Sequence, residues 1–168
     1  MRDNTRRGFL KAMLAASTAP AWIPSAAFGA NERLALAVVG TGGRGRHLAR
    51  QFAKLDEARV VAACDVDARA LTTCVTEMHK AYGDAACAGY ADFREMLVRP
   101  GIDGVIIATP DHWHALVGIA AARAGKHIFC EKPLANSIGE SRALRDAVRR
   151  AGVVLQTGSC ERSRDSAR

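Results

Sequence analysis

Apolar runs alternate with amphipathic segments along most of this chain. The runs 34–39, 60–64, 104–109, 127–130 and 153–156 predict buried strands, and a short extended piece near 87–90 predicts a sixth. Near-continuous apolar strands separated by helical patterns indicate a parallel sheet that is covered on both faces. Residues 31–160 therefore predict one doubly wound α/β domain, a Rossmann fold, with no internal repeat.

Polar residues and glycines mark the helix ends between these strands. Asp67 is expected to cap a helix that runs to about Tyr82, and Gly152 is expected to end the last helix. Capping boxes at 92–95 and 137–140 open two further helices, and a fourth helix is predicted from 110 to 124. The predicted buried stripe of the last helix consists of Leu144, Ala147, Val148 and Ala151.

A glycine motif connects the first predicted strand to the first helix. It is Gly40-Thr41-Gly42-Gly43-Arg44-Gly45, and Asp65 follows 20 residues after Gly45 at the end of the next strand. The first glycine permits a tight turn, the second lets the backbone approach a pyrophosphate, and the third lets the helix pack closely. The helix N-terminus favours the negative charge, and the acid accepts hydrogen bonds from a ribose. We therefore predict dinucleotide binding; the alternative is a glycine-rich turn in another α/β protein.

The residues that follow each predicted strand are the candidate site. In a doubly wound sheet, ligands bind beyond the carboxyl ends of the strands. We expect 40–45, Asp65, Thr109–His114 and Glu131–Pro133 to converge there. The carboxylate of Asp65 favours NAD because it repels a 2′-phosphate, whereas Arg69 nearby keeps NADP as an alternative.

Residues 1–30 resemble an export signal rather than part of the fold. Arg6 and Arg7 are followed by an alanine-rich stretch that Pro20 and Pro24 interrupt. This pattern is typical of a twin-arginine signal peptide, with cleavage expected after Ala27 or Gly29. We expect a periplasmic or exported protein that the twin-arginine machinery carries in folded form. An uncleaved membrane anchor is the less favoured alternative.

Composition excludes several other classes. The net charge of +7 includes +3 from residues 1–30, and the remaining basic residues are scattered among acids, which disfavours nucleic-acid binding. The 5 cysteines lack CxxC spacing, so no zinc site or disulfide framework is predicted, although one disulfide stays open. His112 and His114 lie two apart with no third ligand nearby, and no metal site is predicted.

Five segments resemble one family in order and spacing. They are 40–45, 64–67, 108–114, 130–134 and 156–158, and the chain resembles the glucose–fructose oxidoreductase/inositol dehydrogenase family over roughly 32–163. Glu131-Lys132-Pro133 is the most specific match. Family members are NAD- or NADP-dependent enzymes that act mostly on sugars and cyclitols.

The resemblance also implies roles for individual residues. Lys132 would be the catalytic residue, placed near the nicotinamide, where a partly buried ammonium orients substrate and assists proton transfer. Glu131 would shape that loop beside the cofactor. Thr109 and Pro110 would run along the cofactor, and His114 would belong to the cofactor-side loop and helix start.

The chain departs from the family after the predicted Rossmann domain. Members continue into a second α+β domain that supplies much of the substrate pocket, whereas this sequence ends at Arg168 after the short polar stretch 161–168. We expect a cofactor-binding half that is inactive alone and that meets a sugar only when a second domain is supplied. Alternatives are a fragment of a glycosidase that holds NAD tightly and releases no NADH, or a non-enzymatic NAD-binding module that pairs with another chain.

Overall fold

A six-stranded parallel sheet forms the centre of the domain. The computed structural model describes residues 33–159. The strands are β1 (Leu34–Val39), β2 (Ala58–Cys64), β3 (Ala88–Tyr90), β4 (Gly104–Ile107), β5 (His127–Glu131) and β6 (Leu155–Gly158). Their order in the sheet is β3-β2-β1-β4-β5-β6, and every neighbouring pair is parallel. The predicted Rossmann fold is confirmed, and its switch point lies between β1 and β4.

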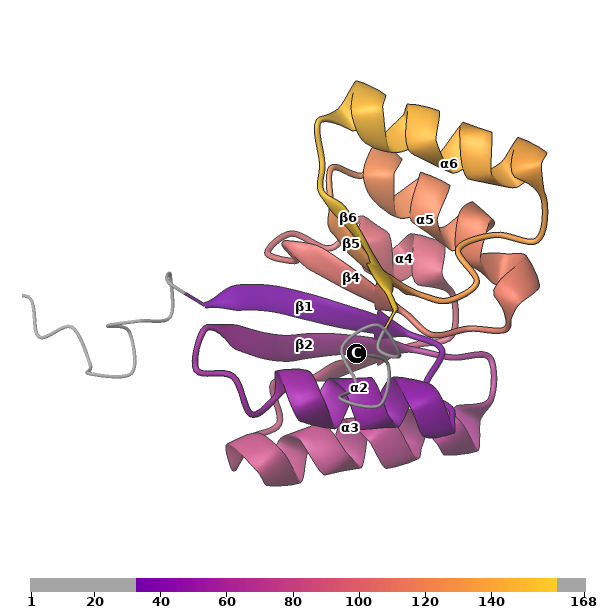
Figure 1. Ribbon diagram of the computed structural model, residues 1–168. Coiled ribbons are helices and arrows are strands. Elements are labelled where there is room, and N and C mark those ends of the chain that lie inside the picture. Colours follow the sequence, from indigo (N-terminus) through magenta and orange to yellow (C-terminus); the bar gives the residue numbers. More distant parts are fainter. Residues whose placement is uncertain (1–32, 160–168) are drawn as a thin grey trace, which may run out of the picture. The chain divides into compact units, whose positions relative to one another are not determined.

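Helices cover both faces of this sheet. They are α2 (Gly43–Phe52), α3 (Ala68–Tyr82), α4 (Phe93–Leu97), the 3₁₀ turn η2 (Asp111–Trp113), α5 (His114–Arg123) and α6 (Ile138–Ala151). Figure 1 shows α2 and α3 on one side of the sheet and α4, α5 and α6 on the other. This layering explains why the strands are apolar on both faces.

The predicted N-cap side chains are present, but neither predicted capping box shows the reciprocal hydrogen bond from the N-cap N–H to the glutamate. Asp67 accepts a hydrogen bond from the Arg69 N–H and begins α3. Ser137 accepts from the Glu140 N–H, but the Glu140 carboxylate accepts from the Asn136 N–H instead of closing the box on Ser137. At α4, Asp92 accepts from the N–H of Arg94, two residues on.

Several element boundaries differ from the prediction. The helix expected from 110 begins as η2 and becomes α-helical only at His114, because Pro110 is extended, with φ −54° and ψ 146°. β4 ends at Ile107 rather than Thr109. β6 begins at Leu155 because residues 153 and 154 form the connection after the left-handed Gly152.

The predicted buried stripe of α6 extends one residue too far at its C-terminal end. Ala151 at the end of α6 is exposed, whereas Leu144 and Ala147 are buried as expected. Leu55 lies beyond the end of α2 at Phe52 and is 49% exposed.

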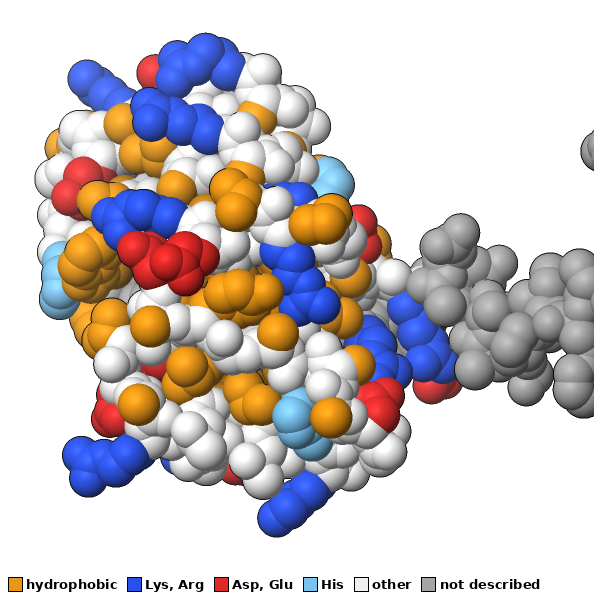
Figure 2. Space-filling view, turned by 180° about the vertical axis from the view of Figure 1, so that it is seen from behind, with side chains coloured by type: hydrophobic (Ala, Val, Ile, Leu, Met, Phe, Trp, Pro, Cys, Tyr) orange, Lys and Arg blue, Asp and Glu red, His pale blue; other side chains and the backbone are white. Residues whose placement is uncertain are grey.

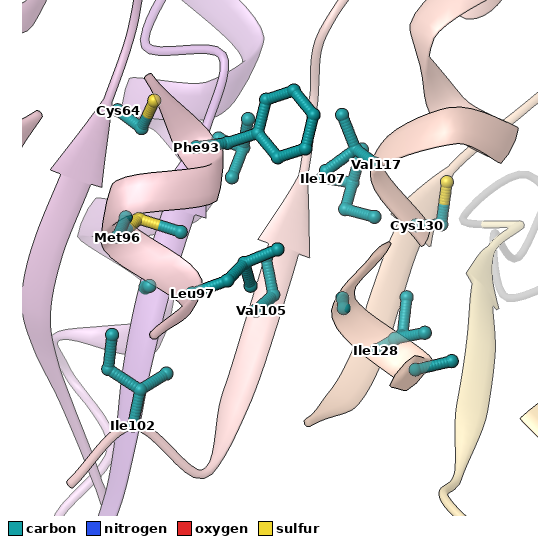
Figure 3. Packing of buried hydrophobic residues seen from close by; sticks show 14 of the residues in the cluster. Cys64, Phe93, Met96, Leu97, Ile102, Val105, Ile107, Val117, Ile128 and Cys130 are labelled. Atoms are coloured by element: carbon teal, nitrogen blue, oxygen red, sulfur yellow. The ribbon is translucent and has the colours of Figure 1, made fainter. Parts of the chain in front are cut away.

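Two buried clusters lie on the two faces of the sheet. Figure 3 shows the cluster under α4 and α5, where Phe93, Met96 and Leu97 face Val105, Ile107 and Val117. The second cluster includes Val38, Leu48, Val60, Met78 and Ile106, beneath α2 and α3. Both layers bury apolar surface and hold the strand ends of the site in place.

The surface between the helices is mixed in character. On the face seen in Figure 2, basic side chains occupy several separate places with acidic side chains among them, and apolar side chains reach the surface between them. Within residues 33–159, no helix combines the length and the apolar run that crossing a bilayer requires. The predicted signal (1–30) and polar tail (161–168) lie outside the described residues.

The four described cysteines are buried free thiols, and we expect them to resist labelling. Burial raises the pKa of Cys64, Cys74 and Cys130 to about 12 and that of Cys87 to about 11. Because the thiolate is the reactive form, at pH 8 a thiol of pKa 12 is ionised about once in ten thousand molecules. A C160S variant should therefore release no rapid colour with Ellman's reagent until it is unfolded. Rapid labelling of the native variant would contradict this burial.

Candidate functional site

The glycine motif forms the turn between β1 and α2. Gly40 has φ +85°, and a Cβ there would lie 2.6 Å from the Thr109 nitrogen of the neighbouring strand end. A Cβ on Gly45 would lie 1.7 Å from the Gly40 carbonyl oxygen, so α2 packs directly on the turn. In contrast, nothing lies within 4 Å of a Cβ built on Gly42. The middle glycine therefore borders open space, as required for close approach of a ligand.

The first turn of α2 is suited to an anion. Gly42 is its N-cap and supplies no side-chain capping bond, and no acidic residue occupies the first turn. Helix N–H groups at such an end carry partial positive charge. This donor set and the uncovered Gly42 fit the pyrophosphate of a dinucleotide.

Asp65 is bonded to the glycine motif itself. Its Oδ2 accepts from the Thr41 N–H at 2.6 Å and from the Thr41 hydroxyl at 3.0 Å, and its Oδ1 accepts from the Asp67 N–H at 2.9 Å. Thr41 is fully buried. Of the roughly four lone-pair positions of a carboxylate, these contacts use three. Thr41 thus orients Asp65, and the carboxylate keeps acceptor capacity toward a ribose.

One cavity of about 380 Å³ joins several of the predicted strand ends. Gly40, Gly42, Asp65, Thr109 and Pro110 line it, as the convergence argument predicted. Its remaining lining is largely apolar and includes Val66, Phe93, Trp113 and Val117. A mostly apolar cavity that has the Asp65 carboxylate in its wall fits the adenosine end of a dinucleotide.

Sequence reasoning missed the contribution of α4 to this cavity. Ala91, Asp92, Phe93 and Arg94 line it. These residues follow β3, which pairs with β2, and the Asp65 N–H donates to the Tyr90 carbonyl. The rule that sites lie at strand ends would have included them if the order of β3 and β2 had been applied.

Glu131 and Lys132 do not line the cavity. Two side chains, those of Arg44 and His114, connect the 131–133 loop to the segments that do line it. The Arg44 guanidinium contacts Glu131 Oε1 through Nε at 2.7 Å and through Nη2 at 2.6 Å. His114 is buried with Nδ1 2.6 Å from the Pro133 carbonyl oxygen and Nε2 2.9 Å from that of Thr109. Gly43, the remaining member of the motif, begins α2 in an open environment.

The environment of Lys132 differs from the expectation. Lys132 is exposed in the described domain, whereas partial burial was predicted. It follows Glu131, the last residue of β5, at the carboxyl end of this strand. The two histidines also differ from each other: His114 faces two carbonyls, while His112 is exposed beside Asp111.

Comparison with protein families identifies this arrangement. Residues 34–159 match the model described as the oxidoreductase family with an NAD-binding Rossmann fold, Gfo/Idh/MocA. The chain belongs to the Gfo/Idh/MocA oxidoreductase family. The family resemblance drawn from the five sequence segments is thereby confirmed, and the match covers the NAD-binding Rossmann domain.

The relatives of this Gfo/Idh/MocA domain include both dehydrogenases and glycosidases. It is 53% identical over 64 residues to levoglucosan dehydrogenase of Pseudarthrobacter phenanthrenivorans, covering 38% of the chain and 16% of the relative. It is 36% identical over 132 residues to a glycosyl hydrolase family 109 protein of Stenotrophomonas maltophilia, covering 75% of the chain and 29% of the relative. The chain therefore spans less than a third of either relative.

A solved structure carries the cofactor on the same fold. Scyllo-inositol dehydrogenase from Lactobacillus casei, with bound NAD(H) and scyllo-inositol, matches with a TM-score of 0.71 and 27% identity, covering 80% of this chain and 38% of that one. The groups of this Gfo/Idh/MocA domain fit the same cofactor, because the N–H groups at the start of α2 donate toward a diphosphate beside the open Gly42 and the Asp65 carboxylate accepts from a ribose.

Proposed function

We propose that this chain is the NAD-binding half of an exported oxidoreductase that acts on a sugar or cyclitol. The observation that carries the proposal is that the glycine motif contacts both Asp65 and Glu131 at the carboxyl ends of the strands, where His114 also bonds the Pro133 carbonyl. The names of two relatives refer to levoglucosan and scyllo-inositol. Both compounds are polyhydroxylated rings, which supports this substrate class. Export rests on the paired arginines Arg6 and Arg7.

The described residues divide the work of this proposed site. The α2 N-terminus and Gly42 hold the diphosphate, and Asp65 holds a ribose of the adenosine end. NAD supplies a hydride acceptor when it is bound. Lys132 would lie beside the reacting hydroxyl, where its ammonium would donate a hydrogen bond to the oxygen and offset the negative charge that develops as the proton of this hydroxyl passes to a base of the second domain or partner chain.

Positioning of the sugar requires residues beyond this domain in the proposal. A substrate must be held against both the cofactor and Lys132 for efficient reaction. Lys132 is exposed in the described part of the chain, which leaves its outer side open to a second domain or a partner chain. We therefore propose that the 168-residue chain binds NAD but turns over little or no sugar alone.

A glycosidase is the second candidate, favoured by the longer match to the glycosyl hydrolase family 109 protein. Such an enzyme would oxidise the sugar, eliminate the aglycone and reduce the product again with no net release of NADH. Translation of the genomic DNA beyond codon 168 in all three frames tests for the second domain in both cases. Assay of that complete product with nitrophenyl glycosides and free sugars then separates net NADH formation from glycoside cleavage.

The fluorescence of Trp113 tests whether the chain itself binds the cofactor. Of the 2 tryptophans in the sequence, Trp113 lines the cavity and Trp22 lies outside the described residues. Because indole emission overlaps the absorption of reduced nicotinamide, NADH bound beside Trp113 should quench tryptophan emission and gain emission of its own. We expect a saturable signal in wild type and in W22F that is largely lost in W113F. A signal unchanged in W113F would place NADH away from this cavity.

A further inference from the structure

A buried carboxylate stands directly before the proposed catalytic lysine. Glu131 is the last residue of β5, and its side chain is only 8% exposed. One oxygen, Oε1, receives both contacts from Arg44, and the other, Oε2, accepts from the Lys132 N–H at 3.3 Å. The carboxylate therefore connects α2 to the backbone of Lys132.

The neighbouring strand is shaped to leave room for this carboxylate. Gly158 of β6 is the register partner of Glu131. A Cβ on Gly158 would lie 3.0 Å from Glu131 Oε1 and 3.1 Å from the Phe129 ring. Glu131 is thus enclosed on the β6 side, and its charge is met from the α2 side by Arg44.

Arg44 lies at the proposed cofactor site, so the ion pair connects that site to Glu131. Arg44 is the second residue of α2, inside the glycine motif that the pyrophosphate would approach. A buried carboxylate is costly unless a counter-charge and hydrogen bonds satisfy it. The arginine that neutralises Glu131 is therefore part of the cofactor-binding loop, although Lys132 belongs to a loop that is distant in sequence.

We propose that the Arg44–Glu131 ion pair is a positioning device that couples dinucleotide binding to the placement of Lys132. The proposal rests on the proposed function, because it needs NAD at the α2 N-terminus. The Arg44 side chain is 44% exposed, and its contacts with Glu131 use Nε and Nη2. A guanidinium carries five N–H donors, so it can bridge Glu131 and a diphosphate at the α2 N-terminus, and each anion then favours the conformation that the other needs. By reciprocity, the formed ion pair favours the diphosphate.

Backbone amide exchange of Lys132 tests the ion pair without any activity measurement. The variants are R44Q, E131Q, the double variant and R44K, with R46Q as the matched control. Arg46 lies on the same helix but pairs with Glu77, so R46Q removes the same charge without touching Glu131. Exchange is followed by NMR on the full 168-residue chain, with thermal melting to verify folding.

In the absence of NAD, R44Q should accelerate exchange of the Lys132 amide about threefold or more, because contacting groups couple at this level. Adding E131Q should bring the rate back toward wild type, since a neutral amide needs no counter-charge. R44K should rescue in part, because lysine keeps the charge but not the planar fork. Equal effects of R44Q and R46Q, or additive effects of R44Q and E131Q, would overturn the proposal. If R44Q alone does not fold, the double variant and R44K still decide it.

Saturating NAD separates this proposal from the proposed function. In wild type and R46Q, NAD should slow exchange of the Lys132 amide further, whereas in R44Q saturated with NAD it should not. If NAD slowed exchange of the Lys132 amide equally in wild type and in R44Q, with NAD bound to both, the coupling would be overturned. Failure of wild type to bind NAD by calorimetry would overturn the proposed function instead, and the exchange rates without NAD would then decide on the ion pair alone.

Discussion

Alanine in place of Gly45 is expected to lower the free energy of unfolding by more than about 3 kcal/mol and to abolish NAD binding. The added Cβ would lie 1.7 Å from the Gly40 carbonyl oxygen and 2.9 Å from its carbonyl carbon. Both atoms are backbone, so no side-chain rotation relieves the overlap, and α2 must move away from the turn. Urea unfolding measures the loss of stability, and calorimetry measures the loss of NAD binding.

Neighbouring glycines provide controls within the same motif. A Cβ on Gly43 meets nothing within 4 Å, so G43A should stay within about 0.5 kcal/mol of wild type. G42A should also keep its stability, because its Cβ enters open space, but it should weaken NAD binding if the pyrophosphate approaches there. If G45A were as stable as G43A, the packing of α2 on the turn would be wrong.

Asparagine in place of Asp65 should lower NAD affinity by about tenfold or more and should lower the preference for NAD over NADP. The amide keeps one oxygen, which can accept from the Thr41 N–H, so the bond to the turn is retained. Its NH2 group cannot accept from the Asp67 N–H, so the change removes the charge together with that one contact. Hydrogen bonds to a charged acceptor contribute about 1.5–3 kcal/mol, and a tenfold change in affinity is about 1.4 kcal/mol. Removal of the negative charge also ends the repulsion of a 2′-phosphate.

Titration of D65N with NAD and NADP gives both affinities. D67N is the matched control, because Asp67 lies two residues away and caps α3 but does not line the cavity. It should keep its stability within about 0.5 kcal/mol, because asparagine caps a helix about as well as aspartate, and its cofactor preference should be unchanged. The same loss of preference in D67N and D65N would mean that charge near the cavity acts without contact to the ribose.

The fold was predictable because local rules agree in this sequence. The apolar runs, the caps at Asp67 and Ser137 and the terminal Gly152 each indicate the element that forms. Errors fell at the ends, where competing backbone geometry decides. An extended Pro110 delays α5 until His114, and the connection after Gly152 shifts β6 by two residues.

The site was predictable only as a set of strand ends. The spacing of the glycine motif and Asp65 predicts a dinucleotide site. In the folded domain these residues line one cavity together with Thr109 and Pro110. Contacts between distant segments were not predictable, because they depend on side-chain geometry in the folded domain. No spacing indicates that Arg44 pairs with Glu131, or that His114 lies between the carbonyls of Thr109 and Pro133.

The burial of Lys132 shows a limit of another kind. The resemblance places this lysine in a partly buried site, but burial depends on every group that packs around it. Residues 33–159 leave its side chain exposed. A motif can therefore identify the chemical group while the surrounding layers, which need not lie near it in sequence, determine its environment.

The most direct measurement is the unfolding free energy of the purified chain with and without NAD. Binding to the native state alone predicts a gain of about 2.7 kcal/mol at an NAD concentration one hundred times the Kd. G42A, which should fold as wild type does, is expected to need more NAD for the same gain. Equal stability of wild type with and without millimolar NAD would contradict the assignment of this domain as an NAD-binding module.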